Sequence, residues 1–392
     1  MMKHILVINA GSSSVKLPVF EVQEKNLVRV INARAVRLFH QDAQITIHDE
    51  NKKVLVEKNL AEITIDPPNH KVVIEFFLGW LSQQQNINLV AVGHRVVHGG
   101  PKYANPVVIT DDVNKDLNSY RPLAPLHQQH NLAPVPVVKE LFPDLLQIAC
   151  FDTAFHQTMP EVAKRFALPE KYYDEGVRRY GFHGLSYEYI VQCLSNCDSK
   201  KIIIAHLGNG ASMCAVAKGK SIATTMSFTP LDGLVMGTRC GDLDPGVVLH
   251  LMTHYSLSAE ETSSILYKKS GLLGVSNDTN NMRKLLESNS QTSKKAVDLF
   301  CYQVNRHIGA LVAELGGLDQ LIFTAGIGEN SSIIREKICG LAKWLGLELD
   351  SQANQENRST ISNKKSSVEI SVIPTNEALM IAKHAMKIFK NT

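Results

Sequence analysis

Two glycine-rich turns carry the side chains of this sequence that are best suited to bind an anion. The first lies within residues 5–19, ILVINAGSSSVKLPV, and ends in Lys16. The second lies within residues 202–216, IIIAHLGNGASMCAV, and begins at His206. Glycine lets the backbone approach a ligand closely, and successive N–H groups in such turns form concave anion sites. One such turn is an ordinary hairpin signal, but the pair favours a phosphate clamp.

Each of these stretches is a short apolar run, a polar turn and a second apolar run, which predicts strand, turn, strand. Two copies of one pattern, nearly two hundred residues apart, predict a duplicated domain.

Charged residues at the ends of other predicted strands extend the candidate site. Arg95 follows a buried strand within a loop rich in Gly and His, and Asp152 directly follows the strand 147–151. Open α/β sheets bind ligands at the carboxyl ends of their strands. The alternative to a ligand-binding role for Asp152 is a structural one, in an Asx turn or as a helix N-cap. Arg239 lies between two glycines and near three acids, which is unlike a solvated run of charges.

The elements that must position these residues alternate between strands and helices. Pro18 lacks an N–H group, so the strand that contains it is expected at a sheet edge or at an irregularity. An amphipathic helix is predicted over 296–315, and its apolar stripe is interpreted as core. The strand 320–324 is followed by a G-x-G turn and a helix, an arrangement that accepts a phosphate or ribose. The polar segment 351–367 is predicted to be a surface loop.

Composition excludes several classes of protein. The 392 residues are 44% hydrophobic and 20% charged, with a net charge of 41 − 38 = +3. That charge is too small to favour a nucleic-acid partner, and no apolar run approaches membrane-spanning length. The start of the chain is unlike a signal peptide. The seven cysteines show no zinc-site spacing, which favours reduced thiols in a cytoplasmic protein.

Ten motifs in order along the chain resemble those of the acetate kinase family: NAGSSSVK, GHRVVHGG, APLH, FDTAFHQTMP, RRYGFHG, HLGNGAS, FTPLDGLVMGTRCGDLDP, SGLLG, FTAGIGEN and PTNEAL. The resemblance implies an α/β fold, the duplicated actin/Hsp70/sugar-kinase (ribonuclease H-like) fold. It implies two domains around a nucleotide cleft that closes on ATP, with boundaries at residues 1–152 plus 379–392 and at 153–378.

The resemblance also implies an activity: reversible, Mg²⁺-dependent, direct in-line transfer of the γ-phosphoryl group of ATP to acetate. Mn²⁺ is expected to substitute for Mg²⁺. A propionate kinase with the same mechanism is the alternative, and a catalytically silent nucleotide-binding regulator or a sugar or glycerol kinase fits less well. Family members further imply a cytoplasmic homodimer that acts on small molecules.

The matching positions imply a role for each site residue. The implied catalytic residues are Arg95, His127, Asp152, His183 and Arg239. The implied ATP-binding residues are Ser12, Ser14, Lys16, His206, Leu207, Gly208, Asn209, Gly210, Asn281, Met282, Arg283, Gly326, Ile327, Gly328, Glu329 and Asn330. Arg95, Val97, Leu126, Phe182 and Pro230 are implied to bind the acyl substrate, and Asn9 and Glu377 to bind the metal.

The chain departs from the family pattern at a few positions. Tyr187 stands where a histidine is usual, and Ala223 where an acid is common. Leu17-Pro18 replaces a segment that usually holds an aromatic residue. Asn281 stands where an aspartate near the adenosine is usual, which puts nucleotide affinity or base preference in question. None of these changes removes a residue implied to contact the phosphoryl group.

Overall fold

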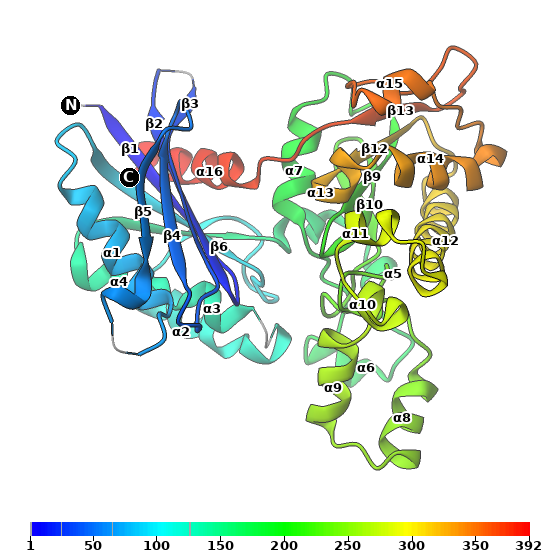
Figure 1. Ribbon diagram of the computed structural model, residues 1–392, viewed down its shortest axis with the longest axis horizontal. Coiled ribbons are helices and arrows are strands. Elements are labelled where there is room, and N and C mark those ends of the chain that lie inside the picture. The colour runs from blue at the N-terminus through cyan, green and yellow to red at the C-terminus, as the bar shows by residue number, and fades with distance from the viewer. Residues whose placement is uncertain (1, 25, 65, 125–126) are drawn as a thin grey trace. The chain divides into compact units, whose positions relative to one another are not determined.

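The computed structural model describes residues 2–24, 26–64, 66–124 and 127–392. The chain forms two compact units, the first made of Met1–Ala154 with Asn376–Thr392 and the second of Phe155–Thr375. Figure 1 shows each unit as a sheet with its own helices. Among the described residues, no helix has the length and apolar character needed to span a membrane.

The first unit is built on an eight-stranded sheet in the order β5-β4-β3-β2-β1-β6-β8-β7. Its strands are β1 (Lys3–Ala10), β2 (Ser14–Val22), β3 (Leu27–Val36), β4 (Gln44–Asp49), β5 (Val54–Asn59), β6 (Asn88–Val96), β7 (Val107–Val108) and β8 (Leu146–Phe151). Its helices are α1 (His70–Ser82), α2 (Asp111–Ser119), α3 (Gln128–Leu132), α4 (Pro134–Leu141) and α16 (Glu377–Asn391).

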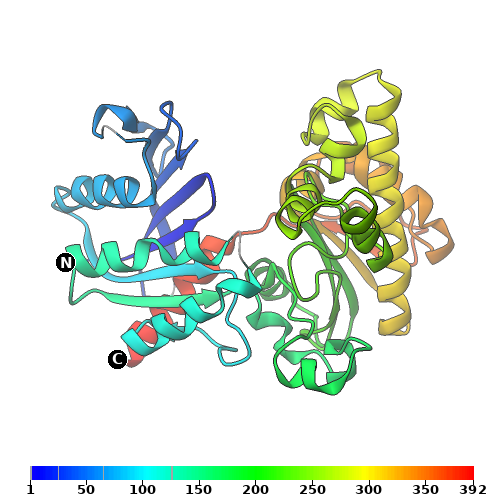
Figure 2. The same ribbon diagram turned by 90° about the horizontal axis from the view of Figure 1, so that it is seen from below.

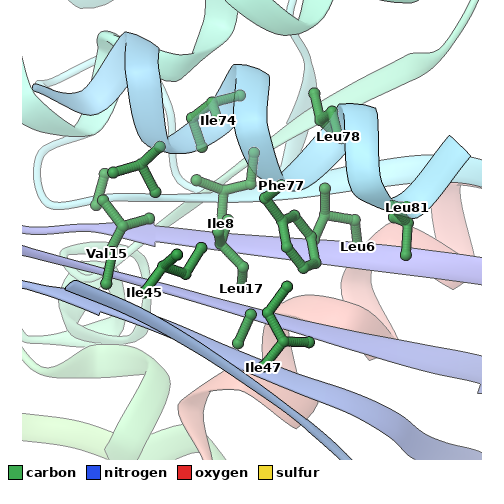
Figure 3. Close-up of a cluster of buried hydrophobic side chains, with 14 of the residues drawn as sticks. Leu6, Ile8, Val15, Leu17, Ile45, Ile47, Ile74, Phe77, Leu78 and Leu81 are labelled. Atoms are coloured by element: carbon green, nitrogen blue, oxygen red, sulfur yellow. The ribbon is translucent and has the colours of Figure 1, made fainter. Parts of the chain in front are cut away.

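Helices cover the central strands of this sheet on both faces. One stripe of α1, which includes Phe77, packs on the alternate side chains of β1, β2 and β4 (Figure 3). The opposite face is covered by α16, which packs on β1, β6 and β8. A Cβ on Gly93 of β6 would collide with Ile381 of α16, so glycine is required there for the helix to approach the sheet.

The second unit has a five-stranded sheet in the order β11-β10-β9-β12-β13. Its strands are β9 (Lys201–Leu207), β10 (Ala211–Ala217), β11 (Lys220–Thr224), β12 (Gln320–Thr324) and β13 (Glu369–Val372). Its helices are α5 (Glu161–Lys164), α6 (Glu170–Asp174), α7 (Gly184–Gln192), α8 (Pro245–His254), α9 (Ala259–Lys268), α10 (Gly271–Ser276), α11 (Met282–Glu287), α12 (Gln291–Leu315), α13 (Ala325–Asn330), α14 (Ser332–Leu341) and α15 (Ser351–Gln355).

Two helices sandwich this smaller sheet. Ile190 of α7 packs against Ile202, Ile204 and Val216 on one face. The long helix α12 contacts β9, β10 and β11, and Figures 1 and 2 both show it running beside the sheet. The apolar stripe of α12 predicted from the sequence is buried, which confirms its interpretation as core.

The two sheets repeat one topology, which confirms the predicted duplication. In the first unit, β1 pairs antiparallel with β2 and parallel with β6, and β6 pairs parallel with β8. In the second, β9 pairs antiparallel with β10 and parallel with β12, and β12 pairs parallel with β13. The two glycine-rich turns therefore join equivalent strands, β1–β2 and β9–β10.

Pro18 lies in β2, an inner strand and not a sheet edge. The β2–β3 register shifts one residue later, between Val19 and Phe20, which is the local irregularity expected as the other possibility.

Two expectations from the sequence were wrong in detail. The expected G-x-G turn after β12 is itself helical, as α13. The expected surface loop 351–367 contains the helix α15 and the fully buried Ile361. The predicted domain boundaries remain a prediction, but Glu377, assigned by them to the second domain, lies in the first unit.

Candidate functional site

The predicted site residues of the first unit gather where three parallel strands end. Asn9 lies near the end of β1, Arg95 near the end of β6, and Asp152 directly after β8. Parallel neighbours end at the same sheet edge, so these side chains are brought together. Arg95 and Gly93 lie on the face of β6 that α16 covers, because side chains alternate along a strand. The first residue of α16 is Glu377, which completes the group.

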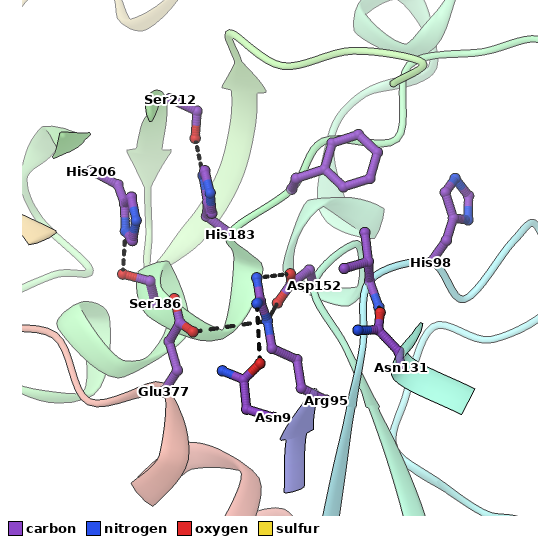
Figure 4. A network of polar contacts seen from close by, with 12 residues as sticks. Asn9, Arg95, His98, Asn131, Asp152, His183, Ser186, His206, Ser212 and Glu377 are labelled. Atoms are coloured by element: carbon purple, nitrogen blue, oxygen red, sulfur yellow. Dashed lines mark hydrogen bonds and ion pairs between the residues drawn. The ribbon is translucent and has the colours of Figure 1, made fainter. Parts of the chain in front are cut away.

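Arg95 is the centre of this group, as Figure 4 shows. Its Nε donates to Oδ1 of Asp152 at 3.2 Å and its Nη2 to Oδ2 at 2.5 Å. Its Nη1 lies 3.4 Å from Oδ1 of Asn9, and its Nε lies 3.8 Å from Oε2 of Glu377. The paired contact fixes the plane of the guanidinium group.

Arg95 and the carboxylates around it stabilise each other's charged forms. Burial raises the pKa of Asp152 to about 6, although the Arg95 charge opposes the shift, so the carboxylate is ionised at neutral pH. Burial also acts to lower the pKa of Arg95, but the carboxylates of Asp152 and Glu377 raise it above its ordinary value. The arrangement is a cation held in place by oxygen atoms that accept from it, and such a fixed guanidinium group suits an anionic ligand.

Asn131, which sequence reasoning did not select, braces this sheet edge. Its Oδ1 accepts from the N–H of Val97 at 2.9 Å, and its Nδ2 donates to the carbonyl of Ala10 at 2.6 Å. It therefore ties the end of β1 to the residue that follows β6. An asparagine within a short helix gives no signal of such a role in a single sequence.

The remaining predicted residues of the first unit follow β6, precede α3 or belong to the first glycine-rich turn. Val97 is buried, and His127 immediately precedes α3. Leu126 lies outside the described residues. The first glycine-rich turn is closed by the N–H of Gly11 donating to the carbonyl of Ser14. Of the predicted phosphate-binding residues there, Ser12 and Lys16 are exposed and Ser14 is half-buried.

In the second unit, two predicted histidines stack on each other. The rings of His183 and His206 are 4.2 Å apart at 12°. Nδ1 of His183 lies 2.8 Å from Oγ of Ser212, and Nδ1 of His206 lies 2.9 Å from Oγ of Ser186 (Figure 4). His206 and Ser212 are partners in the β9–β10 register, so the second glycine-rich turn helps to build this stack.

Arg239 is held near the same turn. Its Nη1 donates to the carbonyl of Pro230 at 3.0 Å. A Cβ built on Gly210 would lie 3.4 Å from Nε2 of His183 and 3.8 Å from Nη1 of Arg239. Gly210 therefore leaves open the space next to both of these nitrogen atoms. Phe182 and Pro230, the predicted apolar contacts, are both buried.

A cavity of about 700 Å³ in the second unit contains most of the predicted adenosine contacts. It is lined by Asn209, Met282, Arg283, Gly326, Ile327 and Asn330, among others. This volume lies in the range of small-molecule sites. Asn281 also lines the cavity and caps α11, because its Oδ1 accepts from the N–H groups of Arg283 and Lys284.

Two further charged side chains hold the wall of this cavity. Oε1 of Glu329 accepts from the N–H of Ala325 at 2.7 Å and of Thr375 at 3.0 Å, so this predicted ATP-binding residue caps α13. Arg335, which sequence reasoning missed, is fully buried and donates to the carbonyls of Gly328 and Glu329 at 2.8 and 3.0 Å. The predicted Leu207 and Gly208 lie in β9 and in the turn after it.

Comparison with known proteins identifies the family to which this chain belongs. Residues 4–383 match the model of the acetokinase family. A protein of Rickettsia felis named acetate kinase is 44% identical over 388 residues, which cover 98% of each chain. A protein of Rhodopseudomonas palustris with the same name is 45% identical over 393 residues, with 98% of each chain covered.

Solved structures are similar as well. A propionate kinase from Francisella tularensis has a TM-score of 0.91 at 35% identity and covers 98% of this chain and 100% of its own. The Porphyromonas gingivalis acetate kinase has a TM-score of 0.86 at 37% identity and covers 98% of this chain and 99% of its own. With its duplicated sheets, its arginine and histidine groups and a match from residue 4 to residue 383, the chain belongs to the acetokinase family.

Proposed function

We propose that this chain transfers the γ-phosphoryl group of ATP to the carboxylate of acetate, reversibly, giving acetyl phosphate and ADP. A carboxylate oxygen attacks the γ-phosphorus in line while the bond to the β,γ-bridging oxygen breaks. The names of its relatives and its family support this reaction. The observation that carries the proposal is the engagement of Asp152: both of its oxygens accept from Arg95.

This contact distinguishes between classes of acceptor. A hydroxyl acceptor must lose a proton and needs a base, whereas a short-chain carboxylate is already ionised at neutral pH. Asp152 acts as the orienter of Arg95, because each of its oxygens accepts from that guanidinium group. The buried, apolar Val97, Phe182 and Pro230 favour a short alkyl group over a sugar.

Charge stabilisation is then the main task of the protein. Phosphoryl transfer spreads negative charge over three equatorial oxygens, and arginine side chains stabilise that charge. We assign Arg95, Arg239 and His183 to these oxygens and the β9–β10 turn to the nucleotide phosphates. The adenosine is assigned to the cavity beside α11 and α13, where Arg283, Gly326 and Asn330 line the wall.

The group around Arg95 also fits a magnesium ion. Asn9 and Glu377 offer an amide and a carboxylate oxygen, which lie 3.4 and 3.8 Å from different nitrogens of Arg95. Mg²⁺ is bound in proteins through one or two such groups plus substrate phosphates and water. The ion, or Mn²⁺ in its place, would neutralise charge on the phosphates. We also propose a cytoplasmic homodimer, as the family resemblance implies, and light scattering in solution tests the dimer.

The test is acyl phosphate formation, trapped as the hydroxamate, with Mg-ATP and acetate, propionate, butyrate or glycerol in parallel. We expect the highest kcat/KM with acetate. A preference for propionate would move the proposal to the activity named for the Francisella tularensis relative. No product with any acceptor, despite measurable ATP binding, would support a silent nucleotide-binding regulator instead.

A further inference from the structure

The ring of His183 is held by a buried chain of hydroxyl groups that begins at Tyr187. Oη of Tyr187 lies 2.5 Å from Oγ of Ser212, which lies 2.8 Å from Nδ1 of His183. The carbonyl of His183 accepts from the N–H of Tyr187 at the start of α7, and both side chains contact Oγ of Ser212. Tyr187 and Ser212 are each 0% exposed.

The direction of this chain follows from the requirement that buried polar groups be paired. Burial raises the pKa of Tyr187 well above its ordinary value, so its hydroxyl keeps its proton. Within the described part of the chain, Oγ of Ser212 is the hydrogen-bond partner found for that hydroxyl. Tyr187 therefore donates to Ser212.

Ser212 must then donate its own hydroxyl hydrogen in a second hydrogen bond. A serine hydroxyl has one donor and two acceptor positions. One acceptor position is used by Tyr187, and the other hydrogen-bond partner of this hydroxyl among the residues described is Nδ1 of His183. Ser212 therefore donates to Nδ1, which must accept. The hydrogen bond made by one ring nitrogen fixes which nitrogen carries the proton, so the neutral His183 ring carries its proton on Nε2.

We infer that Tyr187 is a positioning residue, acting through Ser212 to hold His183 in the tautomer that presents an Nε2–H donor. Nε2 is the nitrogen that lies beside the space left open by Gly210, near Nη1 of Arg239. A donor at this place suits the charge that develops on phosphoryl oxygens. The inference rests on the proposed function for the role of His183, but its statement about the tautomer does not.

Two variants interrupt the chain without removing His183. Tyr187→Phe keeps the ring and its contacts with Phe155 and His156 but deletes the donor to Ser212. Ser212→Ala deletes the link itself. Tyr189→Phe is the matched control, since this tyrosine lies in the same helix, is partly buried and is not part of the chain.

The first readout is spectroscopic and independent of catalysis. Ring ¹⁵N shifts, recorded through two-bond couplings to the ring protons and assigned by comparison with His183→Gln, report which nitrogen is protonated. We expect the Nε2–H form of His183 in the wild type and in Tyr189→Phe, and a mixture of tautomers in Tyr187→Phe and in Ser212→Ala. An Nδ1–H ring in the wild type would overturn the inference.

The second readout is kinetic. Tyr187→Phe should lower kcat by about tenfold, the effect of one lost neutral hydrogen bond, with both KM values nearly unchanged. The double variant with Ser212→Ala should lose no more than the worse single variant, because both act in one chain. Unchanged kcat in Tyr187→Phe, or additive losses, would contradict the positioning role. No acyl phosphate from the wild type would refute the proposed function instead, while the ring shifts would still decide the tautomer.

Discussion

Arg95 shows how a single side chain can be placed for chemistry by its neighbours. Its guanidinium donates to both oxygens of Asp152, so its orientation depends on a planar fork that lysine lacks. Arg95→Lys keeps the charge and loses the paired contact. We expect kcat for acyl phosphate formation to fall by about 100-fold or more, with the circular dichroism spectrum unchanged.

A matched control for this variant is Arg29→Lys, at an exposed position of the same sheet. It should leave kcat unchanged. If Arg95→Lys retained most of the wild-type kcat, the transferred phosphoryl group would have to be stabilised elsewhere.

Asn281 illustrates a departure from the family pattern that the structure explains. Its Oδ1 caps α11 by accepting from two backbone N–H groups. Asparagine and aspartate serve equally well as N-caps, so Asn281→Asp should change the KM for ATP by no more than about twofold. Asn281→Ala should instead lower the free energy of unfolding by about 1 kcal/mol. A switch from ATP to GTP preference in Asn281→Asp would show that the side chain reads the base.

Sequence reasoning found the residues that carry charge at strand ends and missed those that act through another residue. Arg95 and Asp152 could be predicted because an open sheet binds ligands at the carboxyl ends of its strands. Asn131 and Arg335 could not, because their partners are mostly backbone carbonyl and N–H groups whose positions only the fold reveals.

At the scale of elements, the wall of the cavity proposed to bind the nucleotide depends on segments that look unstructured in the sequence. The polar stretch after residue 350 was predicted to be a loop, yet Asn354 within α15 is buried and accepts from Arg335 through both its side chain and its carbonyl. Polar composition usually indicates exposure. Here Asn354 is buried because a guanidinium group with five donors needs acceptors.

Arg335 joins three segments of the second unit, so its loss should lower both the stability of the protein and its affinity for the nucleotide. It donates to carbonyls at the end of α13, to Asn354 and to Oδ1 of Asn357. Arg335→Met would leave these acceptors unpaired, and we expect the free energy of unfolding to fall by about 3 kcal/mol. The KM for ATP should rise because α13 lines the cavity.

Urea unfolding and initial rates measure both effects of Arg335→Met. Arg306→Met, at an exposed position on α12, is the control and should change neither. An unchanged urea midpoint in Arg335→Met would mean that water or rearranged side chains replace the lost donors.

At the scale of the whole molecule, the duplication was predictable from the repeated turns, whereas the return of the last helix to the first unit was implied only by the family resemblance. The two glycine-rich turns have similar sequences because each joins the first two strands of one sheet. The return of the C-terminal helix to the first unit depends on the fit of α16 against Gly93, a long-range contact. A pattern within a single segment holds no information about such a partner.

Each unit also contains a buried histidine that should make the molecule sensitive to acid. Burial lowers the pKa of His94 to about 4, although a hydrogen bond with Gln147 opposes the shift, and it lowers the pKa of His156 to about 4 against a bond with the carbonyl of Phe182. In the unfolded chain a histidine titrates near 6.5. As the pH falls below about 6.5, these histidines bind protons in the unfolded state but not in the folded state. The free energy of unfolding is therefore highest above about pH 6.5 and decreases as the pH falls to about 4.

The size of this effect can be tested one unit at a time. Between pH 7 and pH 5, each histidine should lower the free energy of unfolding by about 2 kcal/mol. His156→Gln should be less stable than the wild type at pH 7 because it loses packing and a hydrogen bond, but its loss between the two pH values should be smaller by about 2 kcal/mol. His40→Gln, at an exposed position, should leave the loss as it is in the wild type. Urea midpoints at both pH values give the comparison. An equal loss in His156→Gln and the wild type would mean that His156 accepts a proton in the folded state, and the acid sensitivity would then have to come from other groups.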